Sequence, residues 1–566
     1  IEDPGLRDAS LEAVAGAERV RAQDNPLRDL SLYGHGSLGR PGGVEVRFGG
    51  GAHRRHASAT STTPADAFAR RPFAREGLSE QTVDGASAFV GVERAALPAG
   101  ITGRARVSFE STASVLHPGA FSGDVADALR YGDIDADANA VARRYFVFTG
   151  TEYVRQYASD GGASPSARGP VGFSRPGARA SVYDRQTASS VQASGSLAGR
   201  VGGHRPEVGG EVEVQTFRRF TLAGATLAAY AADGDAQAVP GFPAGVARYD
   251  QLDFETLRSL VAGYGYTFNG TEAASGESVA GYFDRTETDV APFRPLTAAG
   301  YVRDRFDAGP ATVDVGLRVD LYDARATTLF DPYAVVPILR AGDLSSAPSS
   351  VGDDFAVYRG PSGQTVGYRD RDGQFYDAAG SPSTPDEVLN DRLGQAVETG
   401  GDASEAFAPT EATVQIQPRL GVRFRATDAV VVSGYAVRLS RRPDPSLYVP
   451  FTAYDQLAGF ETVPGSAALR PETVDAAGLG VEVAAAPRLT LGATAFVRQY
   501  RRVPVLQTFV GGLPAYRGVA DVGERDEAGV DLQADLGRTR GVAVHAAYSL
   551  TAAGGDGGTR GTHHAL

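Results

Sequence analysis

Residues 311–322 read ATVDVGLRVDLY, from Ala311 to Tyr322, and alternate strictly between two kinds of side chain. Every odd position in this stretch is apolar, while the even positions include Asp314, Arg318 and Asp320. Because side chains along a β-strand point alternately to opposite faces, the pattern predicts a strand with one apolar and one charged face. At ~3.3 Å per residue the strand is roughly 40 Å long, which suits a tilted crossing of a ~30 Å hydrocarbon layer.

The composition is consistent with a membrane protein built from strands. Only 42% of the 566 residues are apolar, and no stretch approaches the ~18 consecutive apolar residues that a membrane-spanning helix needs. An α-helical membrane protein is therefore excluded. A transmembrane β-barrel fits, because alternation halves the apolar content of each span. The 71 glycines and 23 tyrosines are typical of closely packed strands and of aromatic belts at the membrane surface.

Charge and residue usage exclude several functions. The chain has no cysteine, so disulfides and thiolate metal sites are excluded. All 55 basic residues are arginines, and the formal net charge of −13 argues against general binding of nucleic acid. No nucleophile, base and acid come together in a catalytic pattern, so we expect no enzymatic activity and no cofactor.

Alternating segments like the first recur along the chain. In residues 489–500 the polar side includes Arg498, and in residues 530–536 it includes Asp531 and Gln533. Further examples are residues 102–110, 208–220 and 542–549. Counting such segments predicts roughly 15–18 strands. The apolar sides are mostly Val, Leu and Ala, which suits contact with lipid.

The connections between these segments are of two kinds. The short one at residues 426–428 can close a hairpin directly. Long ones are expected near residues 57–85, 111–142, 157–180, 231–278 and 325–412. Outer-membrane barrels pair short periplasmic turns with long extracellular loops, so the asymmetry supports such a barrel. Within the longest loop, Thr384 and Glu387 form a capping-box pattern that predicts a short helix, and residues 6–20 contain a second helical pattern.

Three small motifs have simpler explanations than the sites they resemble. Residues 34–39 match the dinucleotide fingerprint, but a turn sequence follows them where a helix is required. His53 and His56 have metal-ligand spacing and no nearby third ligand. Residues 370–377 contain part of a calcium-loop pattern at the wrong spacing, so a plain Asp-Gly turn is favoured over a calcium site.

Several short motifs follow one another in a fixed order along the second half of the chain, beginning with residues 294–304, 315–320 and 418–422. Their order resembles that of the barrel of TonB-dependent outer-membrane receptors. Residues 294–304, followed by residues 315–320, are similar to the family's "QxAxYxQD" and "xxGLRxD" strands, and residues 418–422 resemble "SPRLGxxY". Further similarities, in the family's order, are to its "xRPP", "NPxLKPE" and closing "NxGxxxxxGVELE" patterns, at residues 441–443, 469–472 and 521–532. Residues 1–293 match more loosely, in the style of receptors from the Bacteroidetes.

The resemblance implies an all-β fold, a transmembrane antiparallel barrel of 22 strands with a plug domain inside it. We expect residues 1–27 to be a lead-in segment after a plug that this sequence lacks. Residues 28–566 would then be the receptor barrel, with its C-terminal strands missing. An incomplete barrel of this kind would leave an unpaired sheet edge.

The function implied is import of a scarce nutrient across the bacterial outer membrane: a siderophore, corrinoid, oligosaccharide or peptide. The implied partners are the TonB energy-transducing complex, membrane lipid, the nutrient and a surface lipoprotein; no nucleic-acid partner is expected. The lumen-facing candidates are the six polar side chains Asp314, Arg318, Asp320, Arg498, Asp531 and Gln533. Their alternative role is simple hydration of the inner wall, because every other residue of a barrel strand faces inward.

Aromatic residues of the longest loop are a second candidate contact with solute. They are Tyr333, Tyr368, Phe375 and Tyr376, for which packing within the loop is the simpler explanation. Two other classes of protein share the strand pattern. A passive outer-membrane porin has the same alternation without the receptor motifs, and a surface adhesive β-protein would bury its apolar faces internally.

Overall fold

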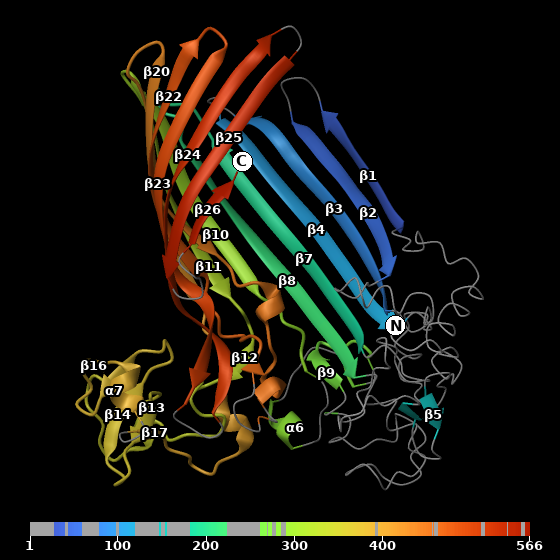
Figure 1. The fold of residues 1–566 in the computed structure, drawn as a ribbon, viewed down its shortest axis with the longest axis vertical. Helices are drawn as coiled ribbons and strands as arrows, with labels where there is room; N and C mark the ends of the chain where they lie inside the picture. Colours follow the sequence, from blue (N-terminus) through green and yellow to red (C-terminus); the bar gives the residue numbers. More distant parts are fainter. Residues whose placement is uncertain are drawn as a thin grey trace, which may run out of the picture.

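The computed structural model describes residues 28–39, 44–58, 79–97, 101–118, 146–148, 153–155, 182–223, 258, 261–268, 270–273, 279–284, 290–390, 394–454, 457, 462–510, 515–539, 542–555 and 561–565. These residues form one large sheet of 17 strands, whose long ribbons run side by side in Figure 1. The strand number lies within the predicted range. Residues 1–27, with the predicted lead-in segment and the helical pattern at residues 6–20, lie outside the described residues.

Fifteen of the strands follow one another across the sheet in chain order, each antiparallel to its neighbour. They are β1 (Arg28–Gly39), β2 (Glu45–Ser58), β3 (Ser79–Leu97), β4 (Ile101–Pro118), β7 (Val182–Ala198), β8 (Glu207–Ala223), β10 (Leu296–Ala308), β11 (Ala311–Asp323), β19 (Thr413–Arg425), β20 (Val430–Arg441), β22 (Glu472–Ala486), β23 (Leu489–Phe509), β24 (Tyr516–Thr539), β25 (Val542–Gly555) and β26 (Gly561–Ala565).

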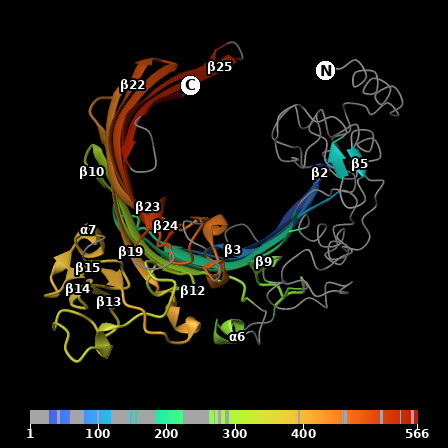
Figure 2. The same ribbon diagram turned by 60° about the horizontal axis from the view of Figure 1, so that its bottom comes forward.

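Two short strands complete the sheet. β9 (Val261–Tyr264) pairs with β8, and β21 (Thr462–Val463) lies parallel to β24. The sheet curls into an open arc in Figure 2. Within the described part of the chain, β1 pairs with β2 alone and β26 with β25 alone. The predicted closure into 22 strands is not tested by this sheet and stays a prediction.

The segment that opened the sequence analysis forms β11, and its register sets the centre of the sheet. β11 pairs with β10 from Ala311 opposite Ala308 and with β19 from Ala311 opposite Phe424. The turn to β10 contains Gly309 at φ +63°, a left-handed conformation that glycine adopts without steric cost. Because a strand repeats every two residues, this register keeps each apolar row on one side of the sheet.

The two faces of the sheet differ as the alternation predicts. Val315, Leu317 and Val319 remain 43%, 41% and 40% exposed, although they are central in the sheet. Their cross-strand neighbours on the same face are also apolar and exposed, among them Ile416, Leu420, Val302 and Val208. From Ala311 to Leu321 the apolar row is about 35 Å long, which a strand tilt of ~40° reduces to about 27 Å, close to the ~25 Å apolar band of outer-membrane barrels.

The connections alternate between short and long, as predicted. Short ones, such as residues 309–310, 426–429 and 487–488, lie at one end of the strands. Long ones, such as residues 224–295, 324–412 and 442–471, lie at the other, because the strands are antiparallel and in chain order. At residues 426–429 the amide of Ala426 donates to the carbonyl of Val430 at 3.0 Å, which closes the predicted hairpin.

The predicted loop boundaries were wrong at several places. β2 and β3 pair through Ser58 and Glu80, well inside the predicted loop at residues 57–85. β4 extends to Pro118, and residues 261–264 join the sheet as β9. Beyond the apolar belt both faces of a strand meet water, so the strands continue without the alternation on which the prediction relied.

The longest connection is a folded unit, which we call the loop domain (residues 324–412). Its neck is a pair formed by β12 (Thr327–Leu329) and β18 (Phe407–Pro409). A five-stranded sheet follows, ordered β16-β15-β14-β13-β17, and Figures 1 and 2 place this sheet outside the arc of the large one. Its strands are β13 (Ala356–Arg359), β14 (Thr365–Arg369), β15 (Phe375–Asp377), β16 (Pro382–Ser383) and β17 (Gln395–Ala396).

Helices are short and few among the described residues. In α7 (Pro385–Leu389) the hydroxyl of Thr384 accepts from the amide of Glu387, and the Glu387 carboxylate accepts from the amide of Thr384, which confirms the predicted capping box. No helix in this part of the protein is long and apolar enough to cross a membrane. The other helices are α6 (Val279–Phe283) and 3-10 turns at Ala341–Asp343, Ala403–Ala406, Pro445–Leu447 and Phe451–Tyr454; β5 (Phe146–Phe148) and β6 (Tyr153–Arg155) form a separate hairpin.

Adjacent residues of β24 test the assignment of the two faces. Leu532 lies on the apolar face and is 46% exposed, whereas Gln533 lies on the polar face and donates to Asp535 at 2.6 Å. Leu532→Arg should cost about 2–4 kcal/mol of stability in a bilayer, since a guanidinium would sit at mid-membrane depth. Gln533→Arg should fold normally. Folding yield into lipid vesicles measures both, and equal yields for the two variants would refute the face assignment.

Candidate functional site

The six predicted polar residues lie on one face of the sheet. Asp314, Arg318 and Asp320 occupy alternate positions of β11, opposite in phase to the exposed Val and Leu side chains. On the neighbouring strands β23 and β24, Arg498 is paired with Glu527 and Thr494 with Asp531. The structure therefore places all six on the charged face.

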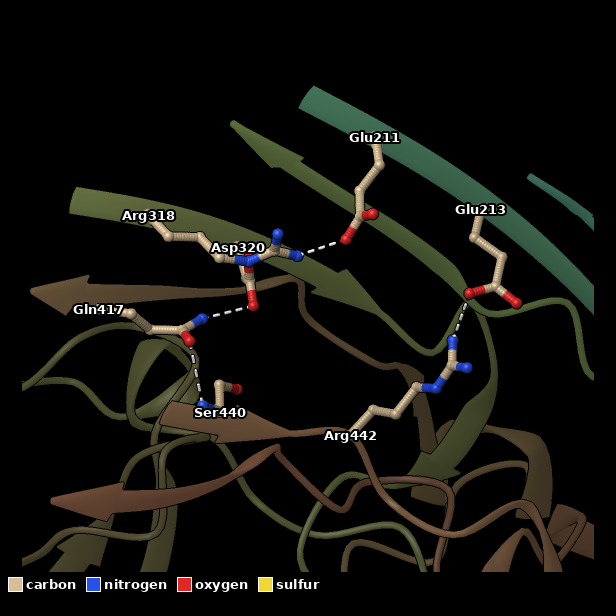
Figure 3. Close-up of polar contacts among 7 residues, drawn as sticks. All are labelled: Glu211, Glu213, Arg318, Asp320, Gln417, Ser440 and Arg442. Atoms are coloured by element: carbon tan, nitrogen blue, oxygen red, sulfur yellow. Dashed lines mark hydrogen bonds and ion pairs between the residues drawn. The ribbon is translucent and has the colours of Figure 1, made fainter. Parts of the chain in front are cut away.

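On β11 the structure brings Arg318 and Asp320 into one network (Figure 3). The guanidinium of Arg318 donates to Asp320 Oδ1 at 2.6 Å and to Glu211 Oε1 at 2.5 Å. Glu211 lies on β8, two strands away, and β10 between them places Ala299 opposite both Glu211 and Asp320. The small side chain of Ala299 leaves the path between the long side chains open.

The network continues to the next strands on the other side. Gln417 of β19 is only 4% exposed; its amide donates to Asp320 and its carbonyl accepts from the backbone amide of Ser440 at 3.2 Å. A buried glutamine amide is costly unless its polar atoms are paired, so these contacts explain why Gln417 is tolerated inside. The network thus spans β8, β11, β19 and β20.

A second ion pair anchors the connection that follows β20. Arg442 Nη1 donates to Glu213 Oε2 at 2.7 Å, from the first residue after the strand to the middle of β8 (Figure 3). Farther along the same connection, Tyr448 packs edge-on against Phe217 and shares a 2.8 Å hydrogen bond with Tyr322. The connection at residues 442–471 is therefore held on the charged face.

The remaining four candidates make only local contacts. They are Asp314, Arg498, Asp531 and Gln533. Asp314 accepts from Arg303 at 2.9 Å, and Arg498 lies 3.5 Å from Glu527 with its guanidinium over the Phe496 ring. Ser549 donates to Asp531 at 2.6 Å. Gln533 contacts Asp535, as described above. The structure does not bring these four into contact with the Arg318 network.

Sequence reasoning did not single out Glu211 and Gln417 of the Arg318 network, nor Glu213 and Arg442 of the second ion pair. The alternation placed Glu213 on the polar side of its strand, and a family-like Arg-Arg-Pro motif marked Arg442 as the start of a loop. Neither signal shows that these two side chains meet. Their contact depends on four intervening strand pairings, which a local pattern does not specify.

The loop aromatics pack against one another. Tyr333, Tyr368 and Phe375 are 8%, 3% and 2% exposed, and Tyr333 lies edge-on to Phe375 at 5.6 Å. Tyr376 is half-buried, and its hydroxyl donates to Asp370 at 3.0 Å. Packing against other side chains of the protein therefore accounts for all four aromatic residues. This agrees with the simpler of the two explanations given in the sequence analysis.

The misleading motifs also have structural explanations. Residues 34–39 belong to β1, in a hairpin with β2. His53 and His56 are three residues apart on β2, so they point to opposite faces. The Asp370–Gly373 segment is a turn, in which Gly373 at φ +94° donates to the Asp370 carbonyl at 3.2 Å. Among the described residues no group of three or more His, Cys, Asp or Glu is placed to hold a metal ion.

The fold and its charged wall agree with a family assignment from sequence. The profile of the family described as TonB dependent receptor-like, beta-barrel, matches residues 102–563. The chain therefore belongs to this family of bacterial outer-membrane proteins, which are transporters rather than enzymes. The predicted family, all-β fold and location are confirmed. No curated protein matches the chain.

Solved structures are also similar to the chain, at low sequence identity. The FrpB iron transporter from Neisseria meningitidis (F3-3 variant) is 9% identical, with 93% of this chain and 52% of that chain covered, at a TM-score of 0.43. The copper transporter OprC is 10% identical, with coverage of 94% and 54% and a TM-score of 0.45. The alcaligin outer-membrane receptor FauA from Bordetella pertussis is 10% identical, with coverage of 94% and 54% and a TM-score of 0.41. The chain thus spans about half the length of these proteins.

The Arg318 network should contribute more to stability than an isolated ion pair on the same face. Arg318→Gln leaves Glu211 and Asp320 without their cation and should lower the free energy of unfolding by about 1–3 kcal/mol. The control is Arg303→Gln, which removes the ion-pair partner of Asp314. Arg303 is more exposed than Arg318, at 42% against 22%, so this variant should lose less than about 1 kcal/mol of unfolding free energy. Urea unfolding in detergent micelles measures both. Equal losses would mean that the network adds nothing beyond its separate pairs.

Buried tyrosines beside the loop domain should make the protein sensitive to alkali. Burial raises the pKa of Tyr454 to about 12, against about 10 in an unfolded chain. The neutral phenol is favoured in the fold, so this stabilisation is complete below about pH 10 and is lost as the pH rises toward 12. Absorbance of tyrosinate at 295 nm should therefore show a late-ionising class that Tyr454→Phe reduces. Loss of one group in the early class instead would contradict the burial.

Proposed function

We propose that this chain forms the wall of an outer-membrane receptor that imports a scarce nutrient by TonB-coupled active transport. The observation that carries the proposal is the sheet with two faces: an exposed Val, Leu and Ala belt on one side and an ion-paired, charged wall on the other. A soluble protein would bury such a belt. Contiguous apolar surface of this extent marks contact with another apolar phase, here the acyl chains of lipid.

Polar pairs at the edge of the belt support this membrane placement. Arg54 binds Asp84 with two hydrogen bonds at 2.6 and 2.9 Å, and Arg438 binds Asp475 at 2.6 and 2.8 Å. By register both pairs lie on the apolar face, at the side toward the long connections. Charged groups are costly at the bilayer centre and tolerated near its surface, so these pairs mark the outer boundary of the hydrocarbon layer.

The six candidate residues would then face the lumen. Wide lumens hold water, and a wall of paired charges such as Arg318 with Asp320 keeps that surface polar without a large local field. The connection at residues 442–471, held by Arg442 and Tyr448, would narrow the lumen near its outer mouth. Solute would enter past it after capture by the loops.

The nutrient and the partners belong to the same proposal. The candidates are a siderophore, corrinoid, oligosaccharide or peptide, each too large or too rare for diffusion through a porin. Energy would come from the TonB complex acting on a plug domain. The loop domain, on the outer side of the arc, is the surface that a lipoprotein partner would reach first.

Energised uptake separates a receptor from a passive porin. In cells that express the complete receptor, uptake of the nutrient should stop when a protonophore collapses the proton-motive force or when TonB is deleted. A porin would continue to admit solute under both treatments. The control is binding of the nutrient to the cell surface, which should persist without energy. Uptake that ignores both treatments would exclude the proposed mechanism.

A further inference from the structure

The connection after β20 reaches strands on both sides of its own. We call its first part, residues 442–454, the strap. At its start the strap contacts β8, where Arg442 binds Glu213 at 2.7 Å. At its end Tyr454 packs edge-on against Tyr516 of β24, at 5.8 Å between ring centroids. Since β10, β11, β19, β20, β22 and β23 lie between β8 and β24 in the sheet, the strap ties together two strands that are distant along the backbone ladder.

The strap is also held by the segment that returns from it to β22. The backbone amide of Ser466 donates to the carbonyl of Leu447 at 2.8 Å. A Cβ atom on Gly465 would lie 2.0 Å from the same carbonyl oxygen, so this close approach requires a glycine. Within the strap, Tyr448 shares its 2.8 Å hydrogen bond with Tyr322 of β11. The strap is therefore fixed at both ends and between them.

Phe451 of the strap is the centre of a cluster of aromatic rings, and its own ring is only 1% exposed. Tyr282 and Phe283 of α6 lie 5.3 and 6.0 Å from it between ring centroids. Phe407 of β18, in the neck of the loop domain, lies 5.6 Å from it and stacks on Phe283 at 5.5 Å. Because α6 belongs to the connection at residues 224–295, the cluster joins three separate outer connections.

The segments that supply these rings are too short to be stable alone. α6 has five residues, and β12 and β18 pair over three residues each. An isolated helix or hairpin of this length is marginal in water, so its order depends on what packs against it. Tyr282 is 2% exposed and Phe407 is 9% exposed, with rings from the other connections against both. Each segment thus buries its rings with the help of the other two.

We propose that the strap, α6 and the neck of the loop domain form one cooperative unit that orders and opens as a whole, with Phe451 at its centre. Loss of one of the three segments removes apolar cover from the other two, so opening one of them favours opening them all. A solute that contacts any one of the three connections would therefore stabilise all of them. The unit does not depend on the proposed function, because it is measured on the isolated chain without solute.

Amide hydrogen exchange of the detergent-solubilised full chain tests the cooperative unit. Phe451→Ala removes a ring that packs on Tyr282 and Phe407, and should speed exchange in α6 and in the neck as well as in the strap, by roughly tenfold or more. The increase should be similar in the three segments, because cooperative segments share one opening equilibrium. The reporters are backbone amides that are hydrogen-bonded in or beside each segment: Asp284, Phe330 and Tyr448.

The matched control is Phe355→Ala, the same change elsewhere in the loop domain. Phe355 is half-buried and packs against Tyr376 at 5.1 Å, in a cluster separate from that of Phe451. Its loss should speed exchange in the five-stranded sheet and leave α6 and the strap at the rates of the parent chain. Phe451→Leu keeps an apolar side chain in place and covers the case in which Phe451→Ala does not fold. It should speed exchange in all three segments by a smaller common factor.

The proposal is overturned if the Phe451 variants speed exchange in the strap alone, or if Phe355→Ala affects α6 as strongly as Phe451→Ala does. Either result would mean that the outer connections open independently. Transport is read separately. If uptake in cells does not depend on energy, the import mechanism fails and the cooperative unit stands; if the three segments exchange independently, the unit fails and the receptor stands.

Discussion

The structure depends on the satisfaction of backbone hydrogen bonds in a medium that offers none. In hydrocarbon an unpaired amide or carbonyl costs several kcal/mol, so a membrane-crossing strand must have a partner on each side along its whole length. The central strands meet this condition: β11 is paired from Ala311 to Tyr322 with both β10 and β19. Because both edges of each strand are used by backbone hydrogen bonds, the chemistry of the sheet is set by the side chains on its two faces.

Those two faces divide the chemistry of the protein. The apolar face carries Val, Leu and Ala side chains that remain exposed because lipid, and not another part of the chain, covers them. The charged face carries side chains long enough to meet across a strand, as Arg318 meets Glu211 over Ala299. Paired charges can line a watery interior without drawing the two walls together, whereas an apolar interior would collapse.

The outer ends of the strands serve a different purpose from their middles. β23 and β24 continue for 21 and 24 residues, far past the belt, and their pairing shifts register between Arg501 and Val505. The loop domain shares a core with β23 and β24, where Tyr333 packs on Phe509. In that core the buried carboxylate of Asp331 accepts from Tyr358 and from the amide of Tyr333. Rigid folded loops hold their side chains in fixed positions, which specific capture of a solute requires.

Much of the fold could be predicted from sequence, because a period of two is a local property. It identified the strands, their apolar and polar sides, the hairpin at residues 426–428 and the capping box at Thr384, each of which depends on residues close together in the chain. The ends of the strands could not be predicted, since alternation stops where both faces meet water. The network of Arg318 and the contact of Arg442 with Glu213 were decided by tertiary structure alone. They depend on which strands pair and in which register, and that choice is made by the whole sheet and not by any one segment.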